Sequence, residues 1–241
     1  IKDLTLEKLV AKEHGFAPKI LGFLPDSHLI HSKVRNVPVL RAGGKETMRS
    51  RVEELRRRGG WDPLPDSTNW FKALMMHPVV PSPEYPTIQS AVDIARPGIQ
   101  LNILVTKNVV GGVKIWDKPC SIDIRADRTR SEPKLTWVRR GRGEGATLDI
   151  RSQGVNLSVE GFKITSTTWY GIYVTRGANV VLKDVDVVGC RLNGIKVIGS
   201  GTNVELVDFS SNNNGNDGLM AVDGASVTLR GSFTANNNRG G

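Results

Sequence analysis

The second half of the sequence predicts a solenoid of parallel β-strands, because two short patterns recur there with a single period. One pattern is a glycine followed two residues later by Asn-Val, Asn-Leu or Ser-Val, and it begins at Gly154, Gly177, Gly201 and Gly224, with successive differences of 23, 24 and 23. The other is Gly-Ile or Gly-Leu, and it begins at Gly171, Gly194 and Gly218, with differences of 23 and 24. Two patterns that share one period indicate identical stacked units.

Each unit is predicted to consist of short strands joined by turns. Apolar residues alternate with other positions, as in Val204-Glu205-Leu206, and β-branched residues dominate. Residues 209–214 end in an asparagine-rich turn, whereas a leucine-rich repeat of similar period needs a helical return limb and a leucine frame. Three strands per unit are therefore favoured. The predicted fold is mainly β, a right-handed parallel β-helix of about 23 residues per coil whose coils stack roughly 4.8 Å apart.

Alignment of the coils predicts which side chains face the core. The inward columns are Leu148/Ile172/Ile195/Leu219, Ile150/Val174/Val197/Ala221, Leu157/Val180/Val204/Val227, Val159/Leu182/Leu206/Leu229 and Phe162/Val185/Phe209/Phe233. Burial of each such side chain is worth roughly 1.5–3 kcal/mol. Earlier in the chain, Val113 aligns with Leu148 at an offset of 35 (148 minus 113), so an inserted loop is expected between residues 125 and 142.

A short helix is predicted at residues 87–96, with Thr87 as its cap and Pro97-Gly98 as its stop. Its apolar side is expected to plug the first coil, whose strand edges would otherwise be open. The stretch from Thr87 to Asp93 resembles the segment that opens pectin-methylesterase-like β-helices, and residues from about 85 onward resemble the parallel β-helix repeat family of pectin-lyase-like proteins. The resemblance implies the fold, which hosts lyases, hydrolases, esterases, epimerases, phage adhesins and catalytically silent scaffolds.

The chain is predicted to have three regions. Residues 1–58 form a basic helical extension, with helices expected at 1–24 and 45–58. Residues 59–86 form a proline-rich linker pinned by Trp61, Trp70 and Phe71, and residues 87–241 form the β-helix. Since 218 plus 23 is 241, the last residue falls where a strand should begin, and the natural protein is expected to continue with further coils.

The net charge of +9 lies before the repeats: residues 1–80 carry 14 Lys/Arg against 9 Asp/Glu, residues 81–153 carry 12 against 8, and residues 154–241 carry 7 against 7. Cys120 and Cys190 lack metal-site spacing, which indicates buried free thiols and favours a reducing, intracellular compartment. No run approaches the roughly 18 apolar residues of a membrane span, so no membrane partner is expected.

The inserted loop is the first candidate for contact with an anionic partner. Its basic residues are Arg125, Arg128, Arg130, Lys134, Arg139, Arg140 and Arg142. Asp127 and Glu132 oppose them, so seven minus two leaves a local charge of +5. Phosphate, uronate or sulfate are the groups that such a cluster attracts; the alternative is a simple solvated loop.

Aromatic residues form a second set of ligand-binding candidates. Trp169 and Tyr170 lie in the turn before Gly171, where they either stack on sugar rings or pack over the turn. Tyr173 belongs to an outward row that aligns Asp149, Tyr173, Lys196 and Met220.

Asp184 and Asp208 occupy the same place in adjacent coils, where the flanking coils carry Gly161 and Gly231. This column predicts a turn with left-handed geometry. The alternative is a pair of carboxylates, weak candidates for catalysis or Ca²⁺ binding; no other metal or cofactor is expected. The runs at 212–214 and 236–238 predict an asparagine ladder.

Motifs of the catalytic members are missing. Asn-Thr-Asp, Asp-Asp, Gly-His-Gly and Arg-Ile-Lys do not occur, residues 78–241 hold no histidine, and the esterase motifs that follow the opening helix are absent. The leading hypothesis is a non-catalytic interaction or scaffold module of a longer protein, with a protein partner. The alternatives are a β-helix that acts on or binds an acidic polysaccharide, and binding of RNA or an acidic protein by the basic N-terminal half.

Overall fold

The structure is a computed structural model that describes residues 44–129, 134–141 and 144–240. The helix expected at 1–24, and Arg130 and Arg142 of the basic loop, lie outside these residues. The chain divides into two compact units, Ile1–Arg51 and Val52–Gly241, with helix α4 (Gly44–Gly59) beginning in the first and continuing into the second. The account below concerns the second unit.

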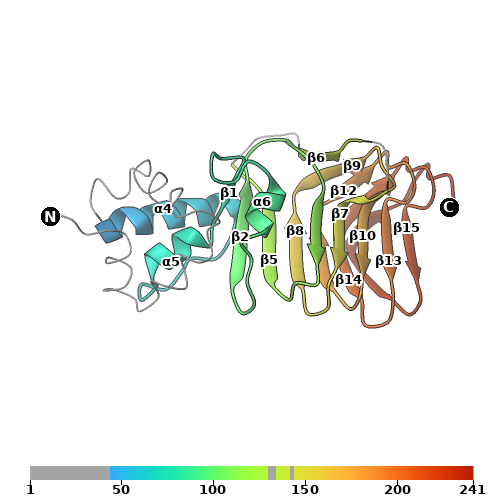
Figure 1. The fold of residues 1–241 in the computed structure, drawn as a ribbon. Helices are drawn as coiled ribbons and strands as arrows, with labels where there is room; N and C mark the ends of the chain where they lie inside the picture. Colours follow the sequence, from blue (N-terminus) through green and yellow to red (C-terminus); the bar gives the residue numbers. More distant parts are fainter. Residues whose placement is uncertain (1–43, 130–133, 142–143, 241) are drawn as a thin grey trace. The chain divides into compact units, whose positions relative to one another are not determined.

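Three series of parallel strands form the solenoid, as Figure 1 shows from β2 to β15. The small sheet consists of β4 (Val113–Trp116), β7 (Ala146–Arg151), β10 (Tyr170–Thr175), β13 (Ile195–Ile198) and β15 (Leu219–Val222). One limb of the large sheet consists of β1 (Val79–Val80), β2 (Gln100–Val105), β5 (Ser121–Ala126), β8 (Asn156–Glu160), β11 (Asn179–Lys183), β14 (Asn203–Asn212) and β16 (Ser226–Thr234). Its other limb consists of β12 (Asp186–Val188), β9 (Phe162–Ser166), β6 (Leu135–Arg139) and β3 (Val109–Val110). The predicted fold class is confirmed.

The register of the strands confirms the predicted columns, but two of their members are not in the core. Ala221 and Leu229 pair with Val197 and Leu206 as expected, yet both are exposed, because their strands lie at the end of the described stack and pair on one side only. Ile172 pairs with Leu148 on one side and with Ile195 on the other, and Ile195 pairs with Leu219. The offset of 35 is also confirmed, because Val113 pairs with Leu148. Along each strand, the side chains between these core residues point to the surface, because successive side chains of a strand face opposite sides of the sheet.

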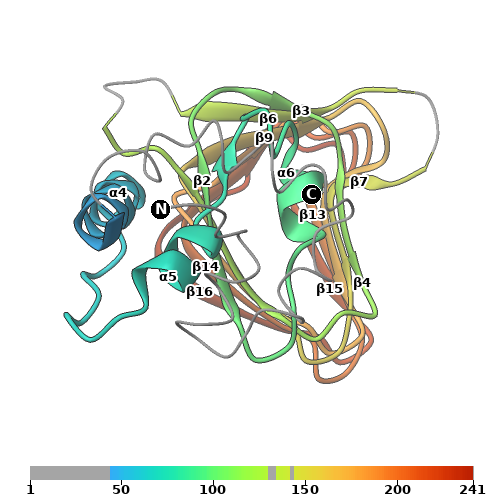
Figure 2. The ribbon, with the colours of Figure 1, turned by 60° about the vertical axis from the view of Figure 1, so that its left-hand side comes forward.

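Helix α6 (Ile88–Val92) covers the first coil, and Figure 2 shows it inside the ring of strands. Thr87 caps it by accepting a hydrogen bond from the Ser90 backbone N–H, as predicted. Ile88, Ala91 and Val92 are buried in the main core cluster. The α-helix is shorter than the predicted span of 87–96, although Ala95 beyond its end is also buried.

The column of Gly161, Asp184, Asp208 and Gly231 forms the predicted left-handed corner, with φ values of 84°, 52°, 49° and 68°. The carboxylates of Asp184 and Asp208 both interact with other residues of the protein. Asp184 lies 2.8 Å from Lys134 Nζ, and Asp208 accepts a hydrogen bond of 3.0 Å from the Ser232 backbone N–H. Hydrogen bonds from Ser232 hold the pKa of Asp208 below its ordinary value.

Asparagine ladders connect successive coils. Asn214 donates to Asn238 Oδ1 at 3.0 Å, within the predicted ladder. A second ladder, which the sequence analysis missed, runs from Asn203 to Asn179 at 3.0 Å and from Asn179 to Asn156 at 3.3 Å.

The segment before the first coil is more structured than a proline-rich linker. It contains helix α5 (Trp70–Met75), capped by Asn69, and strand β1, which pairs with β2. Leu55, Trp61 and Leu104 form a small second core cluster. None of the helices that the structure describes is long and apolar enough to cross a membrane.

Two adjacent residues of β11, Val181 and Leu182, test which side chains face the core and which face the surface. Leu182 is fully buried, whereas Val181 is 36% exposed. We expect Leu182→Ala to lower the free energy of unfolding by about 2–5 kcal/mol, because it leaves a cavity. The control Val181→Ala should change it by about 0.5 kcal/mol or less. Urea denaturation of both variants measures the difference; equal effects would contradict the register.

Candidate functional site

A pocket of about 420 Å³ lies on the outer surface of the small sheet. We call it the aromatic pocket. Its lining side chains are Lys114, Trp116, Glu144, Asp149, Arg151, Trp169, Tyr170, Tyr173 and Lys196. It brings together three of the ligand-binding residues predicted from the sequence, which are Trp169, Tyr170 and Tyr173.

Strand register places most of these side chains. Asp149 pairs with Lys114 on one side and with Tyr173 on the other, and Tyr173 pairs with Lys196. Residues in one row across parallel strands face the same side of the sheet. The outward row predicted from the sequence therefore extends one coil further, to Lys114.

The aromatic rings contact one another. Tyr170 and Tyr173 are stacked with centroids 5.5 Å apart, and Trp169 meets Tyr170 edge-on at 6.1 Å. All three side chains are only partly buried. Part of each of the three side chains is therefore accessible to solvent.

Cationic side chains lie over the rings. The Arg151 guanidinium is between Trp116 and Tyr173, with Cζ 4.9 Å and 5.0 Å from the two ring centroids. Lys196 Nζ lies 5.6 Å from the Tyr170 centroid. The attraction between a cation and a ring face is worth about 0.5–1 kcal/mol at exposed sites, so it favours these orientations.

Asp149 fixes the central arginine. Its side chain is almost fully buried, and its two oxygens accept hydrogen bonds of 2.7 and 3.0 Å from Arg151. These hydrogen bonds raise the pKa of Arg151 above its ordinary value. The carboxylate is thus committed to holding a guanidinium in place.

A family model described as a right handed beta helix region matches residues 148–241. Those residues form a right-handed β-helix. No curated protein and no solved structure matches the chain.

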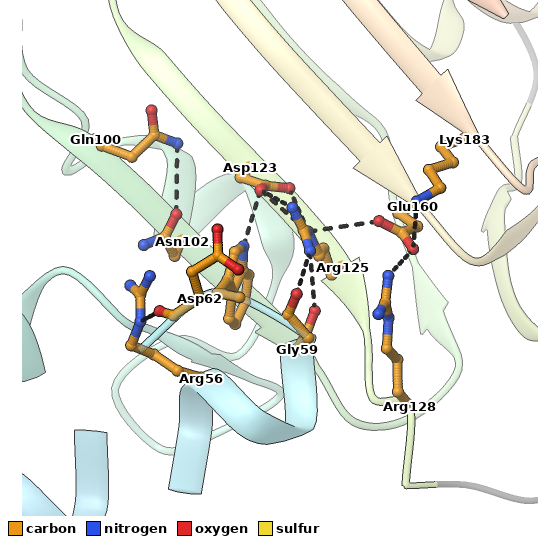
Figure 3. A network of polar contacts seen from close by, with 12 residues as sticks. Arg56, Gly59, Asp62, Gln100, Asn102, Asp123, Arg125, Arg128, Glu160 and Lys183 are labelled. Atoms are coloured by element: carbon orange, nitrogen blue, oxygen red, sulfur yellow. Dashed lines mark hydrogen bonds and ion pairs between the residues drawn. The ribbon is translucent and has the colours of Figure 1, made fainter. Parts of the chain in front are cut away.

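The basic loop of this β-helix is engaged with the protein's own acceptors. Figure 3 shows Arg125 between Asp123 and Glu160, with Arg128 reaching the same Glu160. Arg125 Nη2 lies 2.8 Å from Asp123 Oδ2, and its Nε lies 3.6 Å from Glu160 Oε2. Lys183 Nζ also lies 3.8 Å from Glu160 Oε1.

The other described loop residues are dispersed. Lys134 bridges Asp184 and Asp186 at 2.8 and 2.9 Å. Arg139 donates a hydrogen bond of 2.8 Å to the Ala146 carbonyl, which fastens the connection leading into β7. Arg140 is exposed.

Sequence analysis missed a separate polar network and four members of the aromatic pocket, which are Lys114, Trp116, Glu144 and Arg151. Lys114, Trp116 and Arg151 follow from the offset of 35, which places β4 beside β7. In the separate network, Trp61 Nε1 donates to Asp123 Oδ2 at 2.8 Å. No sequence pattern signals that contact, because the two residues belong to different elements.

Metal binding has no support among residues 44–129, 134–141 and 144–240. They contain no group of three or more His, Cys, Asp or Glu side chains that could hold an ion. Both cysteines are free and buried, and burial raises the pKa of Cys190 to about 12. This thiol is a poor nucleophile at neutral pH.

Removal of Arg151 tests the role of Asp149. We expect Arg151→Ala to lower the free energy of unfolding by about 2 kcal/mol, because the buried carboxylate loses its partner. The double variant Asp149→Asn, Arg151→Ala should recover part of that loss, because an amide is cheaper to bury than a charge. Denaturant titrations measure both; a single variant as stable as the wild type would contradict the assignment.

Proposed function

We propose that this β-helix is a non-catalytic interaction module that binds an acidic polysaccharide in the aromatic pocket. The observation that carries the proposal is the combination of partly exposed rings and cations in one pocket, on residues that stacked strands hold in register. Ligand pockets usually pair apolar or aromatic surface with a few placed polar groups, and this pocket has that composition.

A charged sugar can interact with both the aromatic rings and the cations of the pocket. The C–H face of a pyranose is apolar and gains from leaving water against an aromatic ring such as Tyr170 or Trp169. A uronate carboxylate or a sulfate would meet Lys114 and Lys196, which lie on either side of the Asp149–Tyr173 pair. Rings and cations that are already fixed lower the entropic cost of binding.

The pocket chemistry favours binding over bond cleavage. Glycoside hydrolysis ordinarily uses two carboxyl groups, one of which donates a proton. Of the two described carboxylates in the lining, Asp149 is bound by Arg151, and Glu144 is exposed. The described lining contains no histidine.

A binding assay with a polyuronate and its methyl-esterified form tests the proposal, because esterification removes the charge and keeps the ring. The wild-type chain should bind the acid polymer at low salt, and more weakly the ester. We expect Tyr170→Ala to reduce the affinity roughly tenfold, the equivalent of about 1.4 kcal/mol.

The controls distinguish the pocket from the basic loop. Val110→Ser changes an exposed residue of β3 and should leave binding unchanged. Arg140→Ala should also have little effect; if it abolishes binding while Tyr170→Ala does not, the loop is the site. Tighter binding of single-stranded RNA than of any uronate would favour nucleic acid instead.

A further inference from the structure

Residues 52–77, which we call the strap, comprise the second half of helix α4, helix α5 and the segment between them, and they contact the outer side of β2 and β5. A groove of about 980 Å³ lies beside it, with Arg56, Trp61 and His77 among its lining on the strap side and Asn102 and Asp123 on the strand side. The groove is separate from the aromatic pocket, since the two linings share no residue.

Polar contacts and a few apolar side chains hold the strap. Arg58 Nε donates to Asp127 Oδ2 at 3.0 Å, and Trp61 Nε1 donates to Asp123 Oδ2 at 2.8 Å. Arg125 Nη1 donates to the Gly60 carbonyl at 2.8 Å. Five apolar side chains of the strap are also buried, namely Val52, Leu55, Trp61, Trp70 and Ala73, so apolar packing and polar contacts share in docking it.

His77 lies where the ends of the strap and β2 meet, with only 4% of its surface exposed. Its Nε2 lies 3.1 Å from Arg56 Nη1 and 3.3 Å from Asn102 Nδ2, and its Nδ1 lies 2.6 Å from the Ala73 carbonyl. A guanidinium can only donate, so Nε2 must accept and Nδ1 must carry the hydrogen. The docked strap therefore requires a neutral imidazole.

We propose that the strap is released by acid, with protonation of His77 as the trigger. A proton on Nε2 removes the two hydrogen bonds that this nitrogen accepts, because its N–H then faces the N–H donors of Arg56 and Asn102. It also places a positive imidazolium 3.1 Å from the Arg56 guanidinium. Detachment of the strap relieves both, and it uncovers Asp123, Arg125 and the apolar surface of Leu104 on the β-helix.

The sign of the effect follows from the surroundings of His77. Burial is the main cause that lowers its pKa to about 4, and the Arg56 cation lowers it further against the Ala73 hydrogen bond. The charged groups that act on Arg56 itself are Asp62, Asp123 and Arg125. In a released strap the histidine returns to about 6.5. Docking is then fully favourable above pH 6.5 and weakens as the pH falls toward 4.

The Asp127 carboxylate takes up its proton at lower pH than His77 does. Burial alone would raise the pKa of Asp127, but hydrogen bonds from Arg58 and Thr129 outweigh it and hold the value below normal. Its ion pair with Arg58 therefore persists through the range in which His77 takes up its proton.

Hydrogen–deuterium exchange of the full chain, followed by mass spectrometry and corrected for the intrinsic rate, tests the proposal. Between pH 7 and pH 4.5, protection within residues 52–77 should fall roughly 50-fold, as follows from one group with a pKa near 4 docked and 6.5 released. Protection in β10 and β13 should stay unchanged. In His77→Gln, whose amide does not titrate, strap protection should be the same at both pH values.

Two further variants serve as controls for the role of His77. His28→Gln removes another histidine and should keep the full response. If His77→Gln does not fold, Arg56→Gln probes the same contact, and its response should shrink because the facing cation is gone. Equal protection of the wild-type strap at both pH values, a loss shared by β10 and β13, or a full response in His77→Gln would each overturn the proposal.

Discussion

Parallel pairing of each strand with its equivalent in the next coil is the constraint on which the rest of the structure depends. Ile172 and Ile195 are neighbours because they occupy the same place in two coils, and so are Tyr173 and Lys196 on the opposite side of the same strands. Core and surface are thus ordered by one register. The corner at Asp184 preserves that register, since its left-handed backbone turns the chain without a longer loop.

Sequence reasoning predicted the fold from the features that repeat. Columns such as Leu148/Ile172 are visible because a period of 2 within strands is combined with a period of 23 or 24 between them. The strap was not predicted, because its contacts occur once and join residues far apart, such as Trp61 and Asp123. Six prolines within residues 59–86 also favoured an extended linker, although Asn69 supplied a cap for helix α5.

Charge counts along the chain gave an incomplete account of the basic loop. Seven basic residues against two acidic ones suggest an unpaired cluster, but stacking places Glu160 directly beside Arg125. Partners of that kind come from other coils and do not appear in a count over the loop itself. The aromatic pocket was predicted in part. Tyr173 and Lys196 were found because they occupy the same row in two coils, whereas Trp116 and Arg151 required knowledge of which side chains of β4 and β7 face outward.

The corner residues have a consequence for how this architecture changes length over evolutionary time. Each coil contains its own core side chains, and four successive coils each have their own left-handed corner, so gain or loss of a complete coil leaves neighbouring coils matched. A single inserted residue within a strand instead turns every following side chain of that strand to the wrong face. The connection from Ala126 at the end of β5 to Leu135 at the start of β6 is longer than that from Glu160 to Phe162 in the next coil, which marks it as the place where new sequence can be accepted.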